Sequence, residues 1–120
     1  MDTRRKILTF EAALALPPGL AIAAGIFDIL RADHARDLAA IRTRPLLVAV
    51  MPVEDELLPP RVRAELVAGL RMVDYVVIAD SGELDRLTGA LHPAEVARFE
   101  AADAGRKRQL IEHVRRRQNL

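Results

Sequence analysis

The sequence predicts an α/β fold in which a mainly parallel sheet of four or five strands is covered by helices on both faces. Two observations carry this prediction. Three short apolar runs, near residues 20–27, 45–51 and 74–79, are bounded by turn-forming residues. Such uninterrupted runs are typical of strands buried on both faces. The runs also alternate with amphipathic segments, which is the pattern of parallel strands joined by crossover helices.

Composition places the chain among globular domains. Its 120 residues suit a single domain over residues 1–120. Hydrophobic residues make up 51% and charged residues 29%, which excludes a disordered or collagen-like chain. There is no cysteine. Disulfides, thiolate zinc sites and cysteine nucleophiles are therefore excluded.

The net charge of +1 conceals a basic end. Residues 104–120 carry six Lys/Arg against one Asp/Glu, a bias that fits either nucleic-acid binding or a solvated last turn complementing a helix dipole. Nucleic acid is the less favoured partner because no aromatic residue accompanies these cations.

No segment has the roughly 18 apolar residues needed to span a bilayer. The basic start leads to Glu11 and Pro17-Pro18-Gly19, not to an export segment. We expect a cytoplasmic protein with no membrane partner.

The first part of the chain divides into three segments. An apolar opening over residues 7–16 includes a helical turn starting near Thr9, and Pro17-Pro18-Gly19 ends it. The first buried strand follows over residues 20–27. Asp33 is a good N-cap for a helix over residues 34–42, whose Leu38 and Ile41 point at the sheet.

The second half continues the alternation. After the second strand comes the acidic loop Glu54-Asp55-Glu56, and Pro59-Pro60 then opens a helix. Its predicted apolar face consists of Val62, Leu66, Val67 and Leu70. The β-branched residues of 74–79 define the third strand. Ser81 is the expected N-cap of the next helix, over residues 83–91. The buried face of that helix is predicted to be Leu84, Leu87 and Leu91.

The residues that carry chemistry follow the first strand, in the stretch Gly25-Ile26-Phe27-Asp28-Ile29-Leu30-Arg31-Ala32-Asp33-His34. Here the chain resembles the nucleotidyltransferase superfamily, whose small cytidylyl- and adenylyltransferases carry Gly-x-Phe-Asp-x-x-His-x-Gly-His between their first strand and helix. It is most similar to the heptose-phosphate nucleotidyltransferase domain. Arg63-Ala64-Glu65 and Val73-Asp74-Tyr75-Val76-Val77 resemble a helix and the following strand of that family. The resemblance implies a Rossmann-like three-layer sandwich.

The resemblance also implies a reaction. The family transfers AMP or CMP from ATP or CTP to a sugar or polyol phosphate, with Mg²⁺ bound to the triphosphate. Histidines of the motif stabilise the charge that develops on the phosphates. The expected catalytic residues are His34 and Arg31. The expected nucleotide-binding residues are Gly25, Phe27, Asp28, Asp33, Arg106 and Arg108. Three histidines without clustered spacing predict no metal site built by the protein alone.

The sequence departs from the family at two motif positions. Arg31 replaces the first histidine, and arginine can still hold phosphate oxygens. Asp33 replaces the glycine, so a side chain narrows the approach to phosphate and its charge repels a triphosphate. Two like charges about 4 Å apart cost roughly 4 kcal/mol at an effective dielectric near ~20. We therefore expect weakened or lost catalysis. The alternative is a non-catalytic nucleotide-binding or protein-interaction module.

Simpler roles remain open for the same residues. Asp33 is equally an ordinary helix N-cap, and Asp28 a residue that caps the loop through backbone hydrogen bonds. His34 is as readily a solvent-facing histidine. Arg106 and Arg108 fit a solvated face. A homodimer is expected, because two-fold dimers are the commonest closed assembly.

The predicted structure of two segments near the end of the chain rests on the resemblance in one case and on the sequence pattern in the other. Pro93-Ala94-Glu95 is typical of a helix start. The nucleotidyltransferase family that the chain resembles has a strand at this place, so residues 94–100 are predicted as a fourth strand. A last helix is expected from about Ala104 to Arg117. Its buried residues would be Leu110, Ile111 and Val114.

Overall fold

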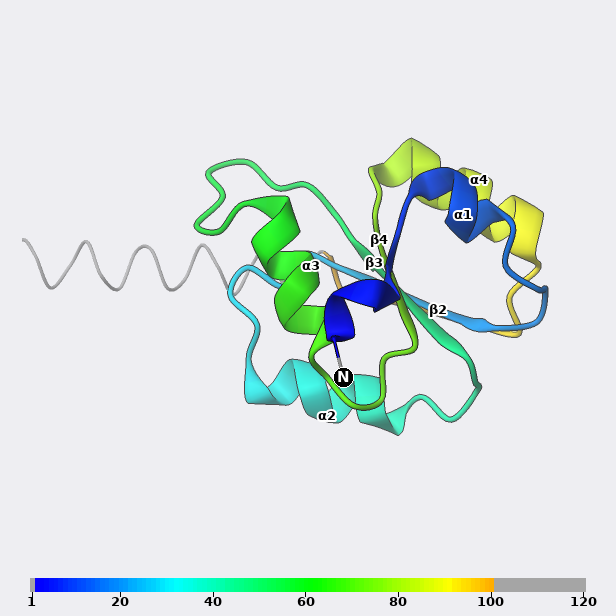
Figure 1. The fold of residues 1–120 in the computed structure, drawn as a ribbon, viewed down its shortest axis with the longest axis horizontal. Coiled ribbons are helices and arrows are strands. Elements are labelled where there is room, and N and C mark those ends of the chain that lie inside the picture. The colour runs from blue at the N-terminus through cyan, green and yellow to red at the C-terminus, as the bar shows by residue number, and fades with distance from the viewer. Residues whose placement is uncertain (1, 101–120) are drawn as a thin grey trace, which may run out of the picture.

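The structure, a computed structural model, describes residues 2–100. It is the predicted Rossmann-like three-layer sandwich, with a five-stranded parallel sheet between two layers of helices (Figure 1). The strands are β1 (Ile7–Leu8), β2 (Ala21–Gly25), β3 (Leu46–Val50), β4 (Tyr75–Ile78) and β5 (Glu95–Arg98). The helices are the 3-10 turn η1 (Thr3–Lys6), α1 (Phe10–Leu14), α2 (Ala32–Ala40), α3 (Pro60–Ala68) and α4 (Ser81–Leu91).

The strand order β1-β4-β3-β2-β5 sets the position of the candidate site. From β2 the chain proceeds through β3 to β4, and it then crosses back to place β5 on the other side of β2. The registers pair Gly25 with Val50 and Ala24 with Arg98. The direction of winding therefore reverses between β2 and β5. Ligands of parallel α/β sheets bind beyond the carboxyl ends of the strands at such a reversal.

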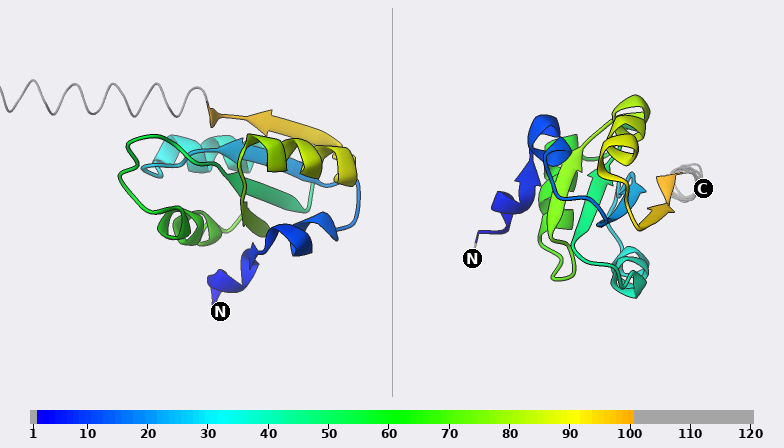
Figure 2. Two further views of the ribbon diagram at one scale, coloured as in Figure 1. Left: turned by 90° about the horizontal axis from the view of Figure 1, so that it is seen from above. Right: turned by 90° about the vertical axis from the view of Figure 1, so that its right-hand side faces the viewer.

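Each face of the sheet has its own helices (Figure 2). Residues of α2 and α3 pack on Ala21 and Ala23 of β2, whereas residues of α1 and α4 pack on Ile22 and Ala24. This alternation follows from the two-residue period of a strand, which sends successive side chains to opposite faces. Small residues along β2 let both helix layers approach the sheet closely.

The predicted strands are confirmed. The three apolar runs contain β2, β3 and β4, and all residues of β2 and β3 are buried. Residues 94–100 contain β5, so the prediction of a fourth strand there is also confirmed. The predicted last helix over Ala104–Arg117 lies outside the described residues, as do Arg106 and Arg108.

The opening segment holds an additional strand. Ile7 and Leu8 pair with Val76 and Val77 of β4 and form the outer strand of the sheet. A strand of two half-buried residues has no detectable period, which is why the sequence did not predict it. The helical turn at Thr9 is confirmed, since the Thr9 side chain accepts from the Ala12 N–H at the start of α1.

Both predicted N-caps are wrong by one or two residues. Arg31, not Asp33, occupies the N-cap position of α2, because the His34 side chain reaches back to the Arg31 N–H and starts the helix earlier. Asp80, not Ser81, caps α4. Its Oδ1 accepts from the Glu83 N–H at 2.7 Å and Glu83 Oε1 accepts from the Asp80 N–H at 3.1 Å, which completes a capping box.

The buried face of α3 also differs from the predicted one. Val62 and Leu66 are exposed, and the buried residues are Arg63, Ala64, Val67 and Ala68. The prediction assigned the larger apolar side chains to the core. Alanines bring α3 close to the sheet instead, and a buried arginine occupies the remaining position. The buried faces of α2 and α4 are as predicted, with Leu38, Ile41, Leu84, Leu87 and Leu91 all buried.

Candidate nucleotide site

The carboxyl end of β2 turns into α2 through a left-handed residue. Phe27 has a φ of 54° and is fully buried. Non-glycine residues rarely adopt this conformation, and it costs roughly 1–2 kcal/mol. Gly25, at which the motif suggested the tight turn, is instead a regular residue of β2 paired with Val50. Phe27 therefore shapes the turn, and burial of its ring offsets the backbone strain.

His34 lies in the first turn of α2 and is 4% exposed. Its ring meets that of Phe27 edge-on, with centroids 5.3 Å apart and planes inclined by 68°. The Nδ1 atom accepts a hydrogen bond from the Arg31 N–H at 2.9 Å. A backbone N–H always donates, so Nδ1 is the acceptor in this contact. The solvent-facing interpretation of His34 is thus wrong.

Arg31 and Asp33 form an ion pair at the start of α2. Arg31 Nε lies 3.6 Å from Asp33 Oδ1, with the two side chains 56% and 30% exposed. The same oxygen accepts from the His34 N–H at 3.1 Å. The carboxylate thus occupies backbone donors at the positive end of the helix, which is where a phosphate would bind. Arg31 offsets part of its charge.

Asp28 ties this turn to the loop after β3. It is 5% exposed, and its two oxygens accept from the backbone N–H groups of Leu57 and Leu58 at 2.7 and 3.0 Å. This arrangement matches the loop-capping role considered for Asp28. A carboxylate with two backbone donors positions the segment around it.

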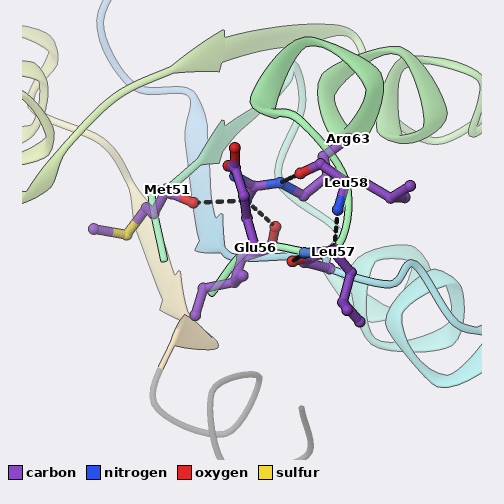
Figure 3. Close-up of polar contacts among 7 residues, drawn as sticks. Met51, Glu56, Leu57, Leu58 and Arg63 are labelled. Atoms are coloured by element: carbon purple, nitrogen blue, oxygen red, sulfur yellow. Dashed lines mark hydrogen bonds and ion pairs between the residues drawn. The ribbon is translucent and has the colours of Figure 1, made fainter. Parts of the chain in front are cut away.

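No role for Arg63 was predicted from the sequence. Its side chain is fully buried and reaches from α3 to the carboxyl ends of two strands (Figure 3). Nη1 donates to the carbonyl oxygens of Ile26 and Met51 at 2.9 and 2.8 Å, and Nε donates to that of Leu58 at 3.0 Å. Nη2 pairs with Glu56 at 3.3 Å. Arg63 therefore joins β2, β3 and the β3–α3 loop at the edge where a ligand is expected.

The spacing of α3 offered a signal for this role. Arg63 stands four residues before Val67, so the two lie on one helix face. An arginine on an apolar face requires several acceptors. The carbonyl groups that follow β2 and β3 supply them.

β5 ends beside the same turn. The Phe99 N–H donates to the Ala24 carbonyl at 2.7 Å, and the Phe99 ring joins the cluster that contains Phe27 and Leu38. Arg98 and Glu100 form an ion pair there, with Nε 2.7 Å from Oε1. Residues 98–100 thus border the reversal point from the β5 side. The sequence placed a strand here and assigned no function to its end.

The structure places all of the predicted site residues that it describes at one end of the sheet. Those at the carboxyl end of β2 are Gly25, Phe27, Asp28, Arg31, Asp33 and His34. Within residues 2–100, no group of three or more His, Asp or Glu side chains is arranged to hold a metal ion. In that same part of the chain, no helix is both long enough and apolar enough to cross a membrane.

Comparison with known proteins adds no assignment. No protein-family model matches the chain, and no curated protein matches it significantly in sequence. The site is therefore interpreted from its own residues and from the motif that they resemble.

Proposed function

We propose that the chain is a nucleotidyltransferase-like domain that binds ATP or CTP at the carboxyl end of β2, with nucleotidyl transfer weakened or lost. The observation that carries this proposal is the position of His34. It is buried in the first turn of the helix that follows β2, beside the reversal of strand order. Parallel α/β sheets bind ligands at this position. The Gly25–His34 motif resembles the nucleotide-binding motif of that superfamily.

The first turn of α2 supplies the groups that phosphate needs. The His34 ring accepts from the Arg31 N–H and packs edge-on against Phe27, which fixes it in the first turn of α2, where histidines of the resembled motif stabilise the charge that develops on phosphate. Arg31 adds a cation that is more than half exposed. In the proposed reaction, an oxygen of a sugar or polyol phosphate attacks the α-phosphorus of the triphosphate. The bond to the leaving pyrophosphate breaks as the new bond forms.

Magnesium would arrive with the triphosphate. Mg²⁺ usually keeps several waters and binds through phosphates with one or two carboxylates, so a preformed cluster of ligands is not required. The ion would neutralise part of the phosphate charge.

Asp33 is also the reason for expecting weak binding. Its carboxylate accepts from the His34 N–H, a donor that phosphate would otherwise use. A triphosphate must displace this contact and approach a like charge. We expect a dissociation constant no tighter than about 0.1 mM, or roughly −5.5 kcal/mol.

Calorimetric titration with ATP and with CTP, each with Mg²⁺, tests the proposal. His34→Gln should weaken binding several-fold, because a flexible amide replaces the buried imidazole ring that is packed against Phe27 at the start of α2. His92→Asn is the matched control, since His92 is exposed at the end of α4 and asparagine tolerates its left-handed backbone. Failure of wild-type protein to bind either nucleotide at millimolar concentration would overturn the proposal.

A pyrophosphate-release assay with sugar phosphates then separates the two forms of this function. Release that depends on Mg²⁺ and is lost in His34→Gln identifies residual transferase activity. Binding without release identifies a non-catalytic nucleotide-binding module. The ion pair of Arg31 with Asp33, where the motif has a histidine and a glycine, favours the second outcome.

A further inference from the structure

Helix α3 exposes two large apolar side chains that take no part in the core. Val62 and Leu66 are 39% and 43% exposed, and they stand one turn apart on the same side of the helix. The opposite side packs on the sheet through Ala64, Val67 and Ala68. Among the helices of residues 2–100, α3 alone carries exposed large apolar residues. It lies at the surface of its helix layer, where a second helix can reach it (Figure 1).

A charged row runs beside this apolar row. Arg61 Nε lies 3.3 Å from Glu65 Oε1, and the two side chains are 57% and 41% exposed. Each of them stands one residue before an apolar one, so with about 3.6 residues per turn the two rows lie side by side along the helix. We call Arg61, Val62, Glu65 and Leu66 the outer face of α3. Its charged row has the cation at the N-terminal end and the anion one turn further on.

The two rows make the outer face complementary to itself when two copies pack antiparallel. A two-fold axis that reverses the helix direction brings like rows together, so that Val62 meets Leu66 of the partner subunit. The same axis sets Arg61 opposite Glu65 of the partner subunit. A parallel two-fold pair would instead place the apolar row against the charged row. A closed two-fold dimer requires a self-complementary patch of this kind.

We propose that the outer face of α3 binds a second copy of this chain, in a two-fold dimer with antiparallel α3 helices. The proposal does not depend on nucleotide binding. Apolar contact along one row and opposite charges along the other give the dimer both attraction and a defined orientation. Because a pair of nine-residue helices forms a small interface, we expect a dissociation constant on the order of 0.1 mM.

Sedimentation equilibrium of the full-length chain, at micromolar to millimolar concentration and low salt, measures this constant. Arg61→Glu and Glu65→Arg each place like charges opposite one another at two points of the dimer. Each variant should therefore dimerise at least about tenfold more weakly than the wild type. Leu66→Ala should weaken the dimer about tenfold as well, because symmetry removes its apolar contact twice. All three side chains are exposed, and far-UV circular dichroism checks that each variant keeps its fold.

An equimolar mixture of the two charge-reversal variants gives the sharpest readout. One chain then has acidic side chains at both positions and the other has basic side chains at both. The mixed dimer should form at least about tenfold more tightly than either variant dimerises alone. Asp85→Arg is the matched control for Glu65→Arg, since it reverses the same charge on α4, at an exposed position on the other side of the sheet. It should leave the wild-type dissociation constant unchanged.

Three results would overturn the proposal. The first is wild-type protein that remains monomeric at millimolar concentration. The second is a dimer that both charge reversals leave unchanged, because the copies would then meet through another surface, or in parallel with each residue facing its own equivalent. The third is a mixture of the two variants that associates no more tightly than its separate components.

Discussion

Asp33 is the residue on which the predicted weakness of the site depends. Its carboxylate accepts from the His34 N–H and pairs with Arg31, which is 56% exposed. A phosphate at the same helix end would use the same backbone donors. Because the ion pair is partly solvated, its charges interact by about 1 kcal/mol or less. The repulsion that a triphosphate meets is accordingly smaller than an isolated carboxylate would produce.

Replacing Asp33 should therefore improve phosphate binding. We expect Asp33→Gly to tighten binding of Mg²⁺-ATP about fivefold, because it releases the His34 N–H and frees Arg31, a gain of roughly 1 kcal/mol. Arg31→His should change the affinity less. Calorimetric titration at fixed magnesium and salt measures both.

Asp37→Gly is the matched control for this substitution. It removes the same charge and adds a glycine to the same helix, but at an exposed position further along α2. Unchanged or weaker binding by Asp33→Gly would show that its carboxylate does not oppose the triphosphate.

At the scale of single residues, the sequence predicted where the β2–α2 turn lies but not which contacts hold it. Phe27, Asp28 and His34 lie at this turn, between the predicted strand and the predicted helix, because local sequence determines a strand-to-helix turn. It did not indicate Arg63, whose acceptors come from three different segments. Contacts of this kind arise only when distant parts of the chain pack together.

The β3–α3 loop is the element that depends most on buried polar contacts. Arg63→Met should lower the free energy of unfolding by about 3 kcal/mol, because it removes the buried hydrogen bonds that Arg63 donates to the carbonyl groups of Ile26 and Met51. Arg61→Met on the exposed side of α3 should cost about 0.5 kcal/mol or less, since it removes only a solvated pair with Glu65. Urea unfolding measures the two values. Equal losses would show that the buried arginine is not a structural link.

The start of α4 offers a second test at the scale of elements. Asp80→Ala should destabilise the protein by about 1 kcal/mol, because Asp80 caps the helix through the Glu83 N–H. Ser81→Ala should have little effect, since Ser81 is the first helical residue and not the cap. Thermal unfolding of the two variants distinguishes these assignments. A larger loss of stability in Ser81→Ala than in Asp80→Ala would show that Ser81, and not Asp80, caps α4.

Element types were predictable and several of their details were not. Continuous apolar runs determine buried strands, so β2, β3 and β4 followed directly from the sequence. Helix starts depend on which side chain reaches which backbone N–H, and this shifted α2 and α4 by one or two residues. The buried face of α3 was mispredicted because alanine packs more closely than Val62 and Leu66, which remain exposed.

At the scale of the molecule, strand order is the feature that determines the position of the proposed site. The arrangement β1-β4-β3-β2-β5 puts the ends of β2 and β5 side by side, although about 70 residues separate them in the chain (Figure 2). Alternating strands and helices predict a parallel sheet, but they do not predict where the strand order reverses. The position of the end of β5 beside the end of β2 thus required the structure. The expected homodimer stays a prediction.

The most direct test of the nucleotide site is a titration of ¹⁵N-labelled protein with Mg²⁺-ATP, followed by amide chemical shifts. The largest saturable shifts should fall on residues 27–34 and 98–100, which surround the carboxyl ends of β2 and β5. Smaller shifts are expected for the β3–α3 loop, which Asp28 and Arg63 join to this edge. Shifts confined to the opposite edge of the sheet, or the absence of saturable shifts at millimolar nucleotide, would contradict the proposed site.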